Sequence, residues 1–192
     1  MKKFLLLSCL IIGICLSFPT INISQSDNLI FNHGINVHDI ISNVIHNTVR
    51  IIARHANGQI FFDETNYNLR TYAGINWQYN QMAGTTAAVC TYIALSNTAI
   101  TPALTDTTLS GEITSAYGLQ RALGTVTHTS NATYYVVSNQ FTNSASGTQS
   151  AQAIALFNNT YANGGTMCFE NTFTQVTLNP NDTITPGWTV NF

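Results

Sequence analysis

Short stretches of alternating apolar and polar residues fill most of the chain after residue 86. Six of them are rich in Val, Ile, Thr, Tyr and Phe and are separated by turn residues; they lie at 88–96, 118–129, 132–142, 152–159, 165–178 and 182–192. No segment of useful length between them has helical periodicity. Short strands at this spacing are typical of an antiparallel β-sandwich or jelly roll. We therefore predict a mainly β fold with strands over 88–192.

The parity of the apolar positions in the last two stretches predicts which side chains share a face. One face of the final stretch carries Ile184, Pro186, Trp188, Val190 and Phe192. In the stretch before it, Met167, Phe169 and Phe173 share a parity that Val176 and Leu178 do not. A change of parity within a strand indicates a bulge or break, which we place near Thr174 and Gln175.

A hairpin and a short helix are predicted before these strands. Asn57-Gly58 separates two apolar runs, and Asn-Gly is a strong signal for a two-residue hairpin turn. This predicts strands at about 47–56 and 59–66, within a hairpin over 47–66. Over 71–83 the pattern predicts a short helix that ends at Gly84. Its apolar face would carry Tyr72, Ile75, Tyr79 and Met82.

The N-terminal residues are typical of a secretory signal peptide. Lys2 and Lys3 precede an apolar or small run to Leu16, and Cys15 and Ser17 are small residues suited to cleavage after position 17. The run is shorter than the roughly 20 residues of a membrane-spanning helix. We expect a signal peptide at 1–17, an extended apolar arm at 18–36 and a single β-sandwich domain at 37–192. The protein is then secreted, to the outside of the cell or its surface, with no integral membrane segment.

Charged residues make up only 7% of the chain, whereas Thr occurs 27 times and Asn 22 times. Six Lys and Arg residues are too few to neutralise the phosphates of a nucleic acid, so no nucleic-acid partner is expected. From 122 to 169 there are 48 residues without any charge. Natural sheets use charge to prevent pairing between edges, so neutral strands of this kind favour association between copies.

Two cysteines, Cys90 and Cys168, follow the expected cleavage site. In an oxidising compartment a pair is first interpreted as a disulfide. The alternative is two buried thiols that do not meet.

Other candidate sites are weaker. Asp106 and Glu112 could hold calcium with nearby Thr oxygens, or Glu112 could instead pair with Arg121; we favour the pair and expect no cofactor or resident metal. Four histidines at 33–55 lack the close spacing of metal ligands. Glycosylation sequons occur at Asn22, Asn131, Asn158 and Asn181.

An ordered series of short motifs runs through 70–192. It reads TYAG at 71–74, YIAL at 92–95, ALTDTTLSGEI at 103–113, LQRA at 119–122, ALFN at 155–158, GGTM at 164–167, FE at 169–170 and DTITPGWTV at 182–190. The series resembles the β-sandwich or jelly-roll surface module of tailed-phage and related virion-associated structural proteins, here combined with a signal peptide. The resemblance implies a sandwich displayed on the outside of a particle, with no enzymatic residues to carry over.

We predict a non-enzymatic, secreted structural protein that assembles with copies of itself into a filament, sheath or surface layer. The apolar arm would add a strand to the sheet of the next subunit, as in donor-strand exchange. The sequence has no nucleophile motif, phosphate-binding motif or paired carboxylates that would indicate an enzyme. One alternative is a virion surface or tail-associated protein. Another is an adhesin that binds glycans by stacking on Tyr134, Tyr135, Tyr161 and Trp188.

Overall fold

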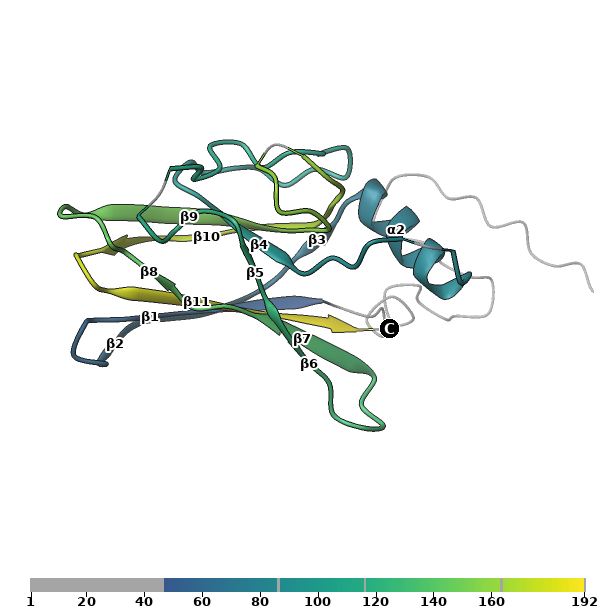
Figure 1. The fold of residues 1–192 in the computed structure, drawn as a ribbon, viewed down its shortest axis with the longest axis horizontal. Coiled ribbons are helices and arrows are strands. Elements are labelled where there is room, and N and C mark those ends of the chain that lie inside the picture. The colour runs from purple at the N-terminus through teal and green to yellow at the C-terminus, as the bar shows by residue number, and fades with distance from the viewer. Residues whose placement is uncertain (1–46, 86, 116, 163, 192) are drawn as a thin grey trace, which may run out of the picture. The chain divides into compact units, whose positions relative to one another are not determined.

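Two antiparallel sheets face each other in the computed structural model (Figure 1), which describes residues 47–85, 87–115, 117–162 and 164–191. These residues belong to one compact unit that begins at residue 45. The predicted mainly β fold with two antiparallel sheets, a hairpin and a short helix is confirmed. The predicted arm at 18–36, the signal peptide, and residues 37–46 of the predicted domain lie outside the described residues. Within the described ranges, no helix has the length and apolar character needed to span a membrane.

The first sheet has the order β2-β1-β11-β7-β6, with β8 also paired to β11. Its strands are β1 (Thr48–Arg54), β2 (Ile60–Tyr67), β6 (Thr125–Thr127), β7 (Tyr134–Ser138), β8 (Phe141–Thr142) and β11 (Thr183–Asn191). Burial alternates strictly along β11, with Ile184, Pro186, Trp188 and Val190 buried. The predicted face of this strand is therefore confirmed over the described residues.

The hairpin between β1 and β2 has a longer loop than predicted. The His55 amide donates to the Gln59 carbonyl, and the strands end at Arg54 and resume at Ile60. Gly58 has a φ of +88°, whereas Asn57 does not have a positive φ. The predicted two-residue Asn-Gly turn requires a positive φ at both residues, so this prediction is wrong. A loop that ends on a left-handed glycine is the usual three-residue alternative.

The second sheet has the order β3-β10-β9-β4-β5. Its strands are β3 (Leu69–Arg70), β4 (Tyr92–Ser96), β5 (Ala122–Leu123), β9 (Gln149–Phe157) and β10 (Met167–Leu178). The β9–β10 register shifts between Thr172 and Val176, which confirms the break predicted there. A second shift between Met167 and Phe169 puts these two side chains in different apolar clusters, so the prediction that they share a face is wrong.

Apolar side chains from both sheets form the main core between them. Trp188 and Ile51 of the first sheet belong to one cluster with Leu95, Leu156 and Phe169 of the second. A smaller cluster on the other side of the second sheet contains Ala94, Ala153, Ala155, Phe157 and Met167, together with Leu109 from the 97–113 loop. Because both faces of β9 are covered, its last five residues are all buried.

Helix α2 (Tyr72–Met82) is capped by Thr71, whose side chain accepts a hydrogen bond from the Gly74 amide. The helix is present where it was predicted, but the face that it buries differs from the predicted one. Gly74 and Trp77 are its buried residues, whereas the predicted core-facing residues are 45–80% exposed: Tyr72, Ile75, Tyr79 and Met82. At Gly74 an added Cβ would lie 2.0 Å from the Cys168 carbonyl oxygen, so the absence of a side chain sets which face approaches β10.

Candidate functional site

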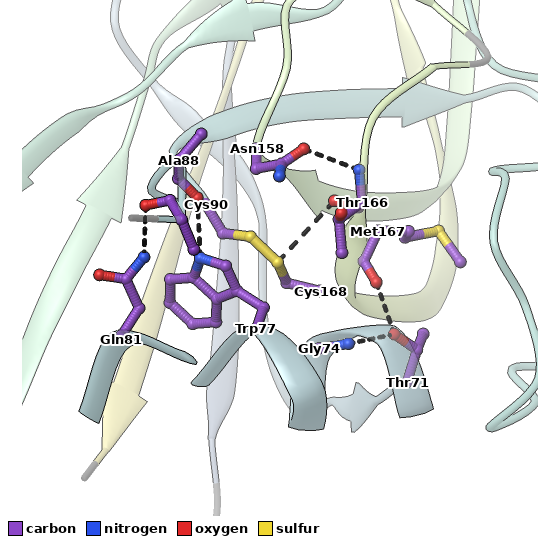
Figure 2. The surroundings of a disulfide bond; sticks show 11 residues. Thr71, Gly74, Trp77, Gln81, Ala88, Cys90, Asn158, Thr166, Met167 and Cys168 are labelled. Carbon is purple, nitrogen blue, oxygen red and sulfur yellow. Dashed lines mark hydrogen bonds between the residues drawn. A yellow bond between two sulfur atoms is a disulfide. The ribbon is translucent and has the colours of Figure 1, made fainter. Parts of the chain in front are cut away.

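Cys90 and Cys168 lie together beneath α2, where Figure 2 shows them joined in a disulfide. Their Cα atoms are 6.5 Å apart, within the range that a disulfide spans. Both residues are fully buried. Cys90 precedes β4 and Cys168 lies at the start of β10, so the pair connects segments separated by 78 residues. The sequence predicted these partners, and the structure places them as a disulfide-capable pair.

Polar contacts hold α2 over this pair (Figure 2). The Thr71 hydroxyl donates to the Met167 carbonyl oxygen at the base of the helix. The Trp77 indole Nε1 donates to the Ala88 carbonyl oxygen at 2.8 Å, and the Gln81 side-chain amide donates to Ala87 at 2.7 Å. The helix is therefore fixed at both ends to the segments that carry the cysteines.

An apolar groove of about 480 Å³ opens between α2 and the inner face of the first sheet. Its lining contains no charged residue and consists of Trp77, Gln78, Gln81, Met82, Val89, Cys90, Thr91, Val126, Tyr135 and Val190. Burial raises the pKa of Tyr135 to about 12. Met82, Val89 and Val126 are exposed by 80%, 57% and 49% of their surface, which is unusual for apolar side chains gathered at one place.

The groove borders one edge of the first sheet, because Val126 lies in β6, the last strand on that side. The three residues of β6 are exposed and uncharged. Gly124 connects β6 to β5 of the other sheet, and an added Cβ there would lie 2.5 Å from Val137. Figure 1 shows the β6–β7 hairpin extending away from the rest of the sheet.

The opposite edge of the same sheet is charged. Arg50 of β1 forms a bidentate ion pair with Asp63 of β2, with distances of 2.8 and 2.6 Å. Arg54 and Glu64 lie on the same hairpin. This hydrogen bonding and the nearby Arg50 charge hold the pKa of Asp63 below its ordinary value. The first sheet therefore has a charged edge at β2 and a neutral edge at β6.

The residues considered for calcium are used in other contacts. Glu112 pairs with Arg121 through both oxygens at 2.8 and 2.7 Å, and both side chains are buried. Arg121 also lies 3.6 Å from the centre of the Phe157 ring. Asp106 is associated with Glu170 instead, because both carboxylates accept a hydrogen bond from the Ala103 amide.

Burial raises the pKa of Glu170 to about 7. The hydrogen bond from Ala103 acts against this shift, and Asp106 adds to it. In the described ranges, no group of three or more His, Cys, Asp or Glu side chains is arranged to hold a metal ion. Glu112 therefore has the ion-pair role that the sequence favoured over calcium.

The three sequons in the described ranges differ in accessibility. Asn131 and Asn181 are exposed turn residues with φ of +67°. Asn158 is half-buried, and its side-chain oxygen accepts a hydrogen bond from the Thr166 amide at 2.7 Å. Asn22 lies outside the described residues. Glycosylation stays a prediction, and Asn131 and Asn181 are the positions whose side chains are open to it.

The aromatic residues proposed to bind glycans do not form one exposed strip. Trp188 is fully buried in the core, and Tyr135 is partly buried and packs against the same core cluster. Tyr134 and Tyr161 are 41% and 72% exposed. Trp188 is thus unavailable for stacking on a sugar. The adhesin alternative retains only separate tyrosines.

The groove and the exposed face of α2 were not found by the sequence reasoning. The available signal was Gly74 followed three residues later by Trp77, a small residue and a large one that together face β10. No protein-family model, curated protein or solved structure matches the chain. The resemblance to virion-associated structural proteins therefore stays a prediction.

Proposed function

We propose that the protein is a secreted, non-enzymatic structural subunit that assembles with copies of itself through its N-terminal arm, residues 18–36. The observation that carries the proposal is the neutral edge at β6 beside an open apolar groove. Proteins that stay monomeric usually protect such an edge with charge. Here the charge is placed at β2, on the opposite edge.

The chemistry of the arm supports the same conclusion. Its apolar residues include Ile21, Ile23, Leu29, Ile30, Phe31 and Ile35, and its one acidic residue is Asp27. An extended peptide with this composition can add to an exposed sheet edge, with its backbone providing affinity and alternate side chains providing specificity. Secretion is supported by the signal-like residues 1–17 and by a cysteine pair suited to an oxidising compartment.

The non-enzymatic part of the proposal is supported by how the acidic residues are used. Glu112, Asp63 and Asp182 each accept hydrogen bonds within the fold: Glu112 from Arg121, Asp63 from Arg50, and Asp182 from the backbone of Asn179. Glu170 is buried beneath the 97–113 loop. These carboxylates are used to hold loops and strands.

The proposal is tested with the mature chain, residues 18–192. Sedimentation velocity and electron microscopy should show oligomers or polymers for this chain. A variant in which 18–36 is replaced by a Gly/Ser sequence of equal length keeps the chain length and should be monomeric. A mature chain that stays monomeric at high concentration, and that is unchanged by the replacement, would refute the proposal.

A further inference from the structure

We infer that the apolar groove between α2 and β6 is the site that receives the arm of a second copy. This inference rests on the proposed self-assembly and adds the acceptor surface. In this arrangement the arm lies beside β6 as an additional strand of the first sheet. Its alternate side chains enter the groove.

The geometry of the first sheet supports this placement. Val126 is directly opposite Val137 in the β6–β7 register, and Tyr135 is opposite Val190 in the β7–β11 register. Side chains at paired and alternate positions share one face of a sheet. Val126, Tyr135 and Val190 accordingly line the same groove. A strand added beyond β6 would place every second side chain on that face, next to Val126.

The arm contains a pair of residues with the matching spacing. Leu29 and Phe31 are two residues apart, so in an extended strand they point to the same side, about 7 Å from each other. Ile21 and Ile23 repeat the same arrangement. The volume of the groove, about 480 Å³, lies within the range of sites that take several apolar groups.

Charge and length are also compatible with an arm from another copy. The groove lining has no charged residue, and the arm has a single acidic one. Nineteen extended residues reach about 60 Å, enough to cross to a neighbouring subunit. Ile75 and Tyr79 of α2 are exposed by 45% and 68% and share a helical face with Met82 of the groove lining, so they provide additional apolar contact area.

The test uses a pair of full-length mature variants on the same strand. Val126→Glu places a charge in the groove, and its exposure of 49% in the free subunit allows the fold to tolerate the change. Thr127→Glu places the same charge on the same edge but on the opposite face, away from the groove, where the side chain is exposed and keeps its contact with water when the arm is bound. It is therefore the matched control. An unpaired charge buried by the arm should weaken assembly at least about 100-fold, whereas Thr127→Glu should leave assembly much closer to that of the unmodified chain.

A third variant, L29D/F31D, removes the apolar pair of the arm and keeps the groove intact. It should be monomeric, as should Val126→Glu. When the two are mixed, the intact arm of the Val126→Glu chain can enter the intact groove of the other chain. Analytical ultracentrifugation should then detect a 1:1 heterodimer. Thermal unfolding of each variant verifies the fold, and Val89→Glu, which is also in the groove lining, replaces Val126→Glu if that chain is unfolded.

The outcomes separate this inference from the proposed function. Assembly of L29D/F31D at the affinity of the unmodified chain would refute the arm-mediated proposal, and the inference with it. Loss of assembly in L29D/F31D but not in Val126→Glu would overturn the groove assignment alone. Two monomeric variants that fail to form a heterodimer would also overturn it, since they would indicate that the groove holds the arm of its own chain or another ligand.

Discussion

The disulfide between Cys90 and Cys168 should provide a large part of the folding free energy. The bond would close a loop defined by a sequence separation of 78 residues, and restricting a loop of this length in the unfolded chain contributes about 4 kcal/mol. Single domains are stable by only about 5–15 kcal/mol. We therefore expect Cys90→Ala, Cys168→Ala and the double variant each to lose about 4 kcal/mol, plus a smaller packing contribution.

Equilibrium unfolding in urea measures these losses. Either single variant removes the bond. The losses of stability in the two single variants, added together, should therefore exceed the loss in the double variant by about 4 kcal/mol. Thiol labelling of the unfolded protein without reductant provides the control and should detect no reactive cysteine. Two labelled thiols in the secreted protein, or single effects that simply add, would refute the reasoning.

Three further predictions concern buried groups. Glu170 has a pKa of about 7 in the folded protein against an ordinary 4.5, so its contribution to stability is full below pH 4.5 and is lost as the pH rises towards 7. Glu170→Gln should flatten this dependence and stabilise the protein at pH 8 by about 2 kcal/mol in thermal or urea unfolding; an unchanged pH profile would contradict it. Glu112→Gln leaves the buried Arg121 charge unpaired and should lose about 3–5 kcal/mol, whereas an effect below 1 kcal/mol, within the range of an exposed pair, would argue against burial. Gly74→Ala forces a Cβ to within 2.0 Å of a backbone oxygen of β10 and should lower the melting temperature, while Gly147→Ala, with open space around it, should not.

The strands were predictable because their side chains alternate between core and solvent. The strict alternation of β11 follows from its place in the middle of the first sheet, with one face on the core. The break in β10 was visible because the apolar parity changes there. The second bulge, near Cys168, left no such signal. Both faces of the second sheet are covered near it, so Met167 and Phe169 are buried on opposite sides.

The orientation of α2 was not predictable from apolar periodicity alone. The expected face has four apolar residues, more than the face that is actually buried. Close packing on β10 requires Gly74 at the contact. Trp77 then fills the core beside Phe169, with 6.4 Å between the ring centroids. Hydropathy gives no weight to a glycine at such a contact. The groove was missed for the same reason, since it exists only because α2 presents this face to the sheet.

The difference between the two edges of the first sheet bears on the form of the proposed assembly. A contact between the arm of one copy and the groove of another joins two different surfaces, and such a contact produces an open chain unless its rotation closes a ring. Pairing between two β2 edges would bring the like charges of Asp63 and Glu64 close together. The charges on this hairpin therefore disfavour an alternative dimer while the neutral β6 edge stays available. In a chain with so few charges, their position matters more than their number.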